Sequence, residues 1–286
     1  MRYRVEHATA YRYSQPVFIE PHVIKLRPRS DTGQELITHT LTLRPEPAGV
    51  ADGIDAENNP FHLAWFDGLA ESFEITSSFV VQTLKTNPFD SFLLSGEQFP
   101  LQFSDPENRV LVPFLDREDF SRPADTQLVA ALGDEAMQAG EGNILGFLTA
   151  LNQFLFERIE KIIRLDSGIQ SLSETLESGR GACRDTALVF IAVCRRAGIP
   201  ARYVSGCQEG DPRTPEGELH AWAEVYLPGF GWKGFDPTHG LAVADRHIAY
   251  AASAVPENTA PVTGTFRGTR AHAQMDHAVR IESLKT

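Results

Sequence analysis

Gly179-Arg180-Gly181-Ala182-Cys183-Arg184-Asp185 places a cysteine after a glycine-rich turn and at the start of a predicted helix. That helix runs from about Cys183 to Arg196, and the Gly198 and Pro200 that follow are typical of a helix end. The first N–H groups of a helix have no partner within it and carry partial positive charge. Both effects favour the thiolate, which is the nucleophilic form of cysteine. The stretch therefore predicts a helix with a reactive cysteine at its N-terminus.

The other two cysteines have no such setting. Cys194 lies in the middle of the same helix among apolar residues, and Cys207 lies on a predicted strand. We interpret both as structural. Cys183 and Cys194 are separated by roughly 16 Å of helical rise, so they cannot form a disulfide. An odd and sparse cysteine count indicates a reducing compartment and no disulfide framework.

Composition limits the class of protein. The chain has 286 residues, 42% hydrophobic and 22% charged, which is ordinary for a soluble globular protein. A net charge of −12 makes nucleic acid an unfavourable partner, because phosphates would be repelled. The N-terminus lacks an apolar run of the kind found in signal peptides, and no stretch approaches 18 apolar residues. We therefore expect a cytoplasmic protein with no membrane partner.

The pattern along the chain predicts an α+β fold in successive regions. Residues 1–86 alternate short strand-like runs with turn signals, which is typical of a β-sandwich-like domain. Residues 87–123 are proline-rich and irregular, and we interpret them as a linker packed on the surface. Residues 124–250 form the predicted core of helices and strands. Residues 251–286 are a C-terminal extension that could lie on either domain.

The predicted core has helices at about 124–139 and 143–159, then a short helix that begins at the capping box Ser171-Leu172-Ser173-Glu174. After the Cys183 helix come three strand-like segments, at 201–206, 220–227 and 232–236. Pro228-Gly229-Phe230-Gly231 turns the last two into a hairpin.

The hairpin carries the candidate partners of the cysteine. His220 opens one strand and is the candidate base, because imidazole titrates near neutrality. Asp236 ends the other strand and is the candidate that orients the histidine. Side chains alternate along a strand, so the two share a face only if the turn has an odd number of residues or a bulge intervenes. The sequence leaves that register open, and His239 is the second candidate base.

Four blocks in order carry a family resemblance: 179–185, Ala197-Gly198-Ile199-Pro200-Ala201-Arg202-Tyr203-Val204-Ser205-Gly206, His220-Ala221-Trp222-Ala223-Glu224-Val225 and Gly231-Trp232-Lys233-Gly234-Phe235-Asp236-Pro237-Thr238. They resemble the bacterial transglutaminase-like superfamily of cysteine proteases. The N-terminal part, with Arg27-Pro28-Arg29 and 55–61, resembles the β-rich region that precedes this core. The likeness spans about residues 1–245. It implies a papain-like or transglutaminase-like catalytic core, with Cys183, His220 and Asp236 as the catalytic triad.

The resemblance and the chemistry together imply acyl transfer through a thioester on Cys183. We expect hydrolysis of a peptide or carboxamide bond by a peptidase or amidase. Transglutaminase-type transfer to an amine, or a non-catalytic binding module on the same fold, are the alternatives. The expected partner is a peptide or protein substrate, and the oligomeric state is left open.

Two further expectations concern the site. Trp222 lies on the strand face of His220 and is a candidate substrate-binding residue, although a core tryptophan is the more common reading. A zinc site at Cys183, His220, Asp236 and His239 is the weaker alternative, because the chain lacks paired ligand motifs. We therefore expect neither a metal nor another cofactor.

Overall fold

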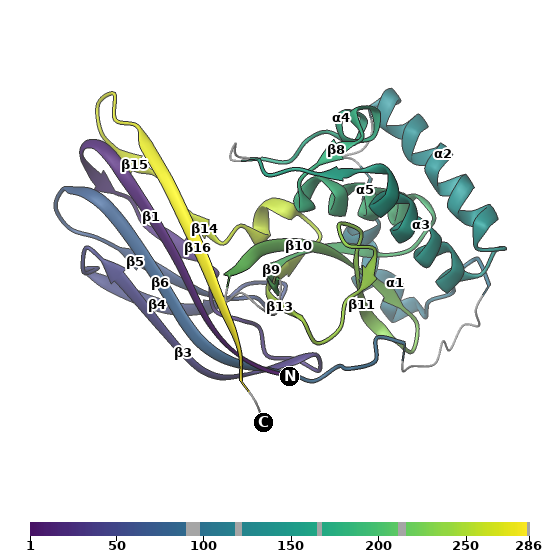
Figure 1. Cartoon of the computed structure of the whole chain (residues 1–286), viewed down its shortest axis with the longest axis horizontal. Helices are drawn as coiled ribbons and strands as arrows, with labels where there is room; N and C mark the ends of the chain where they lie inside the picture. Colours follow the sequence, from purple (N-terminus) through teal and green to yellow (C-terminus); the bar gives the residue numbers. More distant parts are fainter. Residues whose placement is uncertain (90–97, 118–121, 165–167, 211–215, 285–286) are drawn as a thin grey trace.

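Two halves lie side by side in the molecule, one built of long strands and one that carries the α helices (Figure 1). The computed structural model describes residues 1–89, 98–117, 122–164, 168–210 and 216–284. The predicted α+β fold is confirmed, since a ten-stranded sheet and a four-stranded sheet combine with a helical layer. Among the described helices, none has both the length and the apolar character needed to cross a membrane.

The strand-rich half is a sandwich of two sheets. One contains β1 (Arg2–Ile19), β6 (Ala70–Thr83), β3 (Gln34–Arg44) and β16 (Ala273–Leu284). The other contains β14 (Val262–Thr263), β2 (His22–Ile24), β5 (Pro60–Trp65) and β4 (Gly49–Ile54). Tyr3 and Val5 are fully buried while their neighbours Arg2 and Arg4 are exposed, so the alternation along β1 follows the two faces of the sheet.

The C-terminal region completes the sandwich. Strand β16 pairs with β1 along its length, from the pair Arg2–Leu284 to the pair Tyr13–Ala273. It also pairs with β10 (Glu216–Leu227) at Gly217–Val279, so a single strand joins both halves of the molecule. The short strand β15 (Phe266–Arg267) pairs with the far end of β1. The strands between Val262 and Leu284 thus pair with the N-terminal strands, whereas residues 251–253 pair with β9 (Ala201–Glu209).

The region 87–123 contains helices that the prolines did not suggest. Helix α1 (Asp105–Leu111) and the 3-10 helix η1 (Val112–Leu115) lie here, while 90–97 and 118–121 are outside the described residues. Each helix has its proline in the first turn, where the missing N–H costs no hydrogen bond. The region is therefore not irregular throughout, as its prolines had suggested, and its interpretation as a linker packed on the surface stays a prediction.

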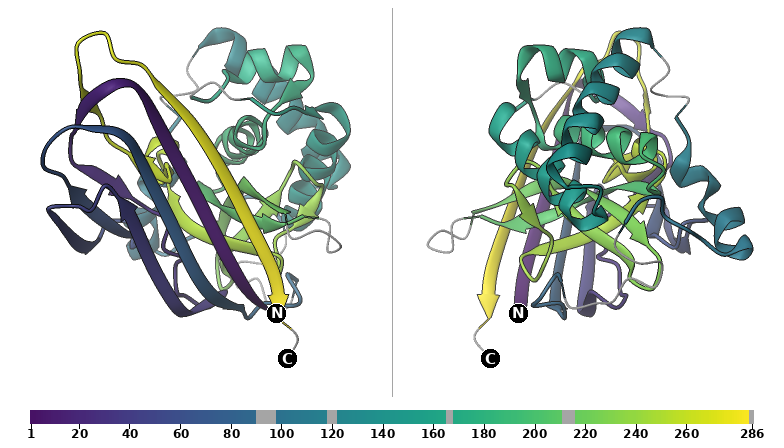
Figure 2. Two further views of the ribbon diagram at one scale, coloured as in Figure 1. Left: turned by 60° about the vertical axis from the view of Figure 1, so that its left-hand side comes forward. Right: turned by 90° about the vertical axis from the view of Figure 1, so that its right-hand side faces the viewer.

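In the helical half, α2 (Pro123–Ala139), α3 (Ile144–Arg158) and α4 (Leu172–Ser178) surround α5 (Cys183–Arg196) (Figure 2). The predicted start signals act as expected: the side chains of Asn143 and Ser171 accept hydrogen bonds from N–H groups in the first turns of α3 and α4. Helix α5 is buried on nearly all sides, so it forms the centre of this half.

An antiparallel set of strands packs against α5. Strand β10 lies between β9 (Ala201–Glu209) and β11 (Gly231–Asp236), and β13 (His247–Ser253) pairs with β9. The short strand β12 (Leu241–Ala242) pairs with β11. Ala221, Ala223 and Val225 of β10 share one core with Phe190 of α5. The opposite face of β10 carries His220 and Trp222, which follow the alternate positions of the strand.

Candidate active site

The start of α5 is held in place by the segment before it. Gly179 has a φ of 63°, a left-handed conformation that suits glycine and ends α4. Strand β8 (Arg180–Gly181) then pairs with β7 (Glu160–Lys161). The 3-10 helix η3 (Pro256–Thr259) comes later in the chain, after β13. The fixed chain path delivers Cys183 to the first position of α5.

Asp185 completes the N-terminus of α5. Its carboxylate is fully buried and accepts hydrogen bonds from the N–H of Ala182 at 2.8 Å and the N–H of Gln170 at 2.8 Å. The Arg164 guanidinium donates to both carboxylate oxygens at 2.8 and 2.7 Å. A buried carboxylate of this kind is paired and hydrogen-bonded, so its role is to fix the helix start beside Cys183.

The three cysteines fall into the two classes predicted for them. Cys194 and Cys207 are fully buried, and burial raises the pKa of Cys194 well above its usual value and that of Cys207 to about 12. Cys183 is only partly buried. Burial is the largest influence on its pKa and acts upward, but the contact with His220 and the N–H of Ala221 reverse it, so the Cys183 pKa is lowered.

The register of the β10–β11 hairpin brings His220 and Asp236 to one face. Leu227 pairs with Gly231, so the turn contains three residues, 228–230. With this odd number, the register continues from the pair Ala223–Phe235 to place Asp236 opposite Trp222, on the face that also carries His220. The question that the sequence left open is therefore answered by a three-residue turn.

His220 and Asp236 form a buried hydrogen-bonded pair. The His220 Nε2 donates to Asp236 Oδ2 at 2.8 Å, and both side chains are 0% exposed. Burial is the largest influence on the His220 pKa and acts downward, but the bonds with Asp236 and Cys183 outweigh it and raise the pKa to about 9. For Asp236, burial is again the largest influence but acts to raise the pKa. The three histidine hydrogen bonds outweigh it and bring the Asp236 pKa well below its usual value.

The other ring nitrogen of His220, Nδ1, is the one available to contact Cys183. Within the described part of the chain, Nδ1 is buried and has no hydrogen-bond partner of normal geometry. Their mutual contact nevertheless lowers the pKa of the Cys183 thiol and raises that of the His220 imidazole. We interpret this as a Cys183–His220 contact looser than a standard hydrogen bond, which is common in unliganded catalytic pairs. The structure thus brings Cys183, His220 and Asp236 together.

Two more histidines contact the same carboxylate. His239 Nδ1 and His247 Nε2 donate to Asp236 Oδ2 at 2.9 and 3.0 Å, and the N–H of Thr238 donates to Oδ1 at 3.0 Å. His239, the second candidate base, is therefore a partner of the aspartate. Sequence reasoning missed His247 because it reaches the site only through the pairing of β13 with β9, for which the apolar run 247–253 gives no local signal.

Trp222 lies beneath the histidines and is 1% exposed. Its ring stacks on that of His220 at 6.2 Å between centroids and meets His247 edge-on at 5.2 Å. It packs with Val204 and Ala252 in a small core. These contacts make Trp222 a support for the two imidazoles, and the substrate-binding role stays a prediction.

A metal ion is the other use such a cluster could have. Ligand atoms of His220, Asp236 and His247 lie within 4.8 Å of one another. However, all three imidazoles direct a ring nitrogen at one carboxylate oxygen over 2.8 to 3.0 Å, which hydrogen bonds fully account for. The cluster thus fits a hydrogen-bonded carboxylate, and we derive no metal-dependent step.

A cavity of about 520 Å³ lies away from this cluster, beside Leu36, Val50 and His62 of the sandwich.

A cysteine at a helix N-terminus, a strand-borne histidine and a buried aspartate form the arrangement expected of a thiol-nucleophile site of the triad type. The comparisons with known proteins agree with this class. Residues 132–237 match the Transglutaminase-like superfamily, and residues 3–82 match the Bacterial transglutaminase-like N-terminal region. The chain thus contains a core of the Transglutaminase-like superfamily, preceded by a bacterial transglutaminase-like N-terminal region.

Individual relatives match either the whole chain or a part of it. An uncharacterized protein of Mycobacterium leprae is 26% identical and covers 99% of both chains. A protein-glutamine gamma-glutamyltransferase of Pseudomonas aeruginosa is 33% identical over 39% of this chain and 18% of its own. The structure of a candidate cysteine protease from Cytophaga hutchinsonii superposes with a TM-score of 0.69 at 18% identity, covering 99% of this chain and 98% of that one. The last comparison supports the fold.

Proposed function

We propose that the protein hydrolyses peptide or carboxamide bonds through a thioester formed on Cys183. The arrangement of His220 supports this most strongly. Its Nε2 is bonded to a buried aspartate, its Nδ1 faces Cys183, and the pKa values of the two reacting groups are moved toward each other. Such a pair rests as thiolate and imidazolium, which is the form that attacks a carbonyl.

The reaction follows from these positions. The Cys183 sulfur attacks the carbonyl carbon, and the N–H of Cys183 at the first position of α5 is placed to stabilise the oxyanion. The His220 imidazolium gives its Nδ1 proton to the leaving amine as the C–N bond breaks, leaving a thioester. Neutral His220 then takes a proton from water, the hydroxyl oxygen bonds to the carbonyl carbon, and the carboxylic acid and the thiolate are released.

Transfer to an amine is the second candidate. It is favoured by the local likeness to the protein-glutamine gamma-glutamyltransferase, which spans 122 aligned residues and only part of each chain. The thioester step is the same, and the incoming nucleophile differs. Peptide or protein remains the proposed substrate, and the cytoplasm remains the proposed location.

Trapping the acyl-enzyme tests this function. Incubation with a library of peptides and glutamine-containing substrates should give a protein whose added mass lies on Cys183, and turnover should fall by about 10⁴-fold in Cys183→Ala. Cys194→Ala is the matched control, because Cys194 is a fully buried cysteine of the same helix. Modification that persists in Cys183→Ala would contradict the assignment of the nucleophile.

A second measurement addresses the non-catalytic alternative. Iodoacetamide should alkylate Cys183 at neutral pH faster than it alkylates a free thiol such as glutathione, because the thiolate is stabilised at this site. A reaction no faster than that of glutathione would indicate a binding module on the same fold. Supplying a primary amine during turnover then distinguishes transfer from hydrolysis by the mass of the product.

A further inference from the structure

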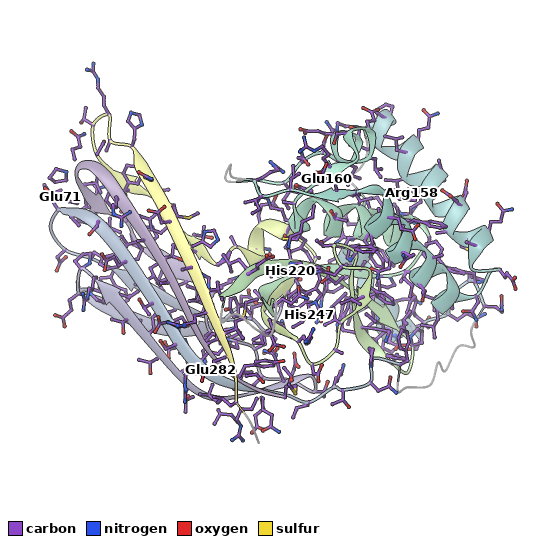
Figure 3. The ribbon with its side chains drawn as sticks, viewed as in Figure 1. Glu71, Arg158, Glu160, His220, His247 and Glu282 are labelled. Carbon is purple, nitrogen blue, oxygen red and sulfur yellow. The ribbon has the colours of Figure 1, made fainter. Side chains whose placement is uncertain are left out.

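One oxygen of Asp236 accepts three imidazole N–H groups, and only one of these imidazoles faces the cysteine. His220 donates from β10, His239 from the turn after β11 and His247 from β13, at 2.8 to 3.0 Å. Figure 3 shows His220 and His247 in the interior, where the strands meet the helical half. The mechanism above uses only His220, so the other two donors need a separate explanation.

The chemistry of the carboxylate fixes the protons on these rings. An ionised carboxylate only accepts hydrogen bonds, so each nitrogen that faces Asp236 carries a hydrogen. For His247 this places the hydrogen on Nε2 and leaves Nδ1 without one. Within the described residues that Nδ1 is buried and has no hydrogen-bond partner. This suits a neutral ring, because leaving an unprotonated nitrogen without a partner costs less than leaving a buried N–H without one.

His247 and His239 differ in their access to water. The His247 side chain is 3% exposed, and burial, the largest influence, lowers its pKa, so the ring is a neutral donor at neutral pH. The His239 side chain is 32% exposed. Water can replace a donor at the position of His239, whereas the buried position of His247 is closed to water.

We propose that His247 is a positioning residue of the active site, a buried imidazole donor that keeps Asp236 ionised and turned toward His220. This inference rests on the proposed function and adds a residue to it. His239 has the same contact in a weaker form, because solvent competes there. Together with Thr238 on Oδ1, the three imidazoles provide hydrogen bonds to both carboxylate oxygens, which favours one orientation of the Asp236 side chain.

The charged surroundings of the site set the expected direction of the effect. The ionisable groups nearest these histidines are Cys183 on α5 and an ion pair of Lys161 with Glu218. In that ion pair, Lys161 Nζ lies 2.5 Å from Glu218 Oε2. Donors to an ionised carboxylate lower its pKa, so removing the His247 donor raises that of Asp236. Protonation of Asp236 at mildly acidic pH then removes the anion that supports the His220 imidazolium, and the thiolate is lost with it.

The pH profile of Cys183 alkylation by iodoacetamide measures this without any substrate. In His247→Phe, which keeps a ring against Trp222 but has no N–H, we expect the acid limb to move upward and the rate at pH 5 to fall about tenfold. His247→Gln supplies an amide N–H at the same reach and should restore the rate to within about twofold. His239→Ala should lose only about two- to threefold. The exposed His272→Ala is the matched control and should not change it.

Nitrogen NMR of the wild-type protein labelled in its histidine rings tests the same point even if a variant fails to fold. The expected result is a neutral His247 with its hydrogen on Nε2, seen as a downfield N–H resonance that His247→Phe removes. A charged His247, the opposite tautomer or an acid limb unmoved in folded His247→Phe would overturn the proposal. So would failure of folded His247→Gln to restore the rate, or a profile that EDTA alters. Alkylation and NMR need no turnover, so these results are independent of the Cys183→Ala test.

Discussion

Two clusters of histidine and aspartate in this chain behave in opposite ways. In the active site, Asp236 is fully buried and the pKa of its partner His220 is raised to about 9. In the sandwich, Asp52 is 68% exposed and accepts a hydrogen bond from His62 Nδ1 at 2.6 Å, with His39 stacked on His62. Burial, followed by the neighbouring His62 and Arg27, lowers the His39 pKa to about 4.

The difference lies in where the carboxylate is, since the residue types are the same. A buried carboxylate that is held ionised by several N–H groups acts through a medium of low polarity, and it stabilises a nearby imidazolium strongly. An exposed carboxylate is screened by water, and the effect of Asp52 on the pKa of His39 is smaller than the cost of burying the charged imidazole. The comparison predicts that equal substitutions at the two aspartates will have very unequal effects.

The largest expected effect is on turnover in Asp236→Asn. The amide keeps the size of the side chain but presents an N–H toward rings that already donate, so His220 loses both its orientation and its counter-charge. We expect kcat to fall by about 10³- to 10⁴-fold, measured on protein that circular dichroism shows to be folded. A folded variant within tenfold of wild type would show that the aspartate is not the orienting group.

Local signals predicted much of this site and long-range pairing supplied the rest. The glycine-flanked start of α5 and the ends of the hairpin strands were legible because caps and turns depend on neighbouring residues. The shared face of His220 and Asp236 depended on whether the turn had three residues or four, which its Pro-Gly-Phe-Gly sequence does not decide. The pairings of β13 with β9 and β16 with β1 join residues far apart in sequence, so neither His247 nor the course of the C-terminus could be predicted.

A middle-sized effect is expected on stability at acidic pH, from a buried histidine outside both clusters. His7 on β1 is 0% exposed, and burial, followed by the charge of His277, lowers its pKa from 6.5 to about 4. Below pH 6.5 the unfolded chain binds a proton at this residue that the folded chain does not, so stability falls as the pH drops toward 4. At pH 4.5 the loss should be roughly 2 to 3 kcal/mol.

His7→Gln removes this titration and keeps a group that can bond Thr9. The free energy of unfolding in urea should therefore fall less between pH 7 and pH 4.5 in the variant than in wild type, by roughly 2 kcal/mol. Comparing the two pH values within each protein cancels the cost of the substitution itself. An equal fall in both proteins would contradict the assignment of His7 as a buried neutral histidine.

The smallest effect is expected at the exposed aspartate, and it is the sharpest check of the comparison. Asp52→Asn removes the charge beside His62, but a carboxylate that is 68% exposed already interacts mostly with water. The free energy of unfolding should change by less than about 1 kcal/mol, and turnover should stay at the wild-type level. If Asp52→Asn cost as much stability as breaking a buried pair does, about 3 kcal/mol or more, burial would not be what separates the two clusters. The matched result, with Asp236→Asn inactive and Asp52→Asn unaffected, would show that burial of the carboxylate and its donors, and not the mere pairing of histidine with aspartate, makes a site that can hold a thiolate–imidazolium pair.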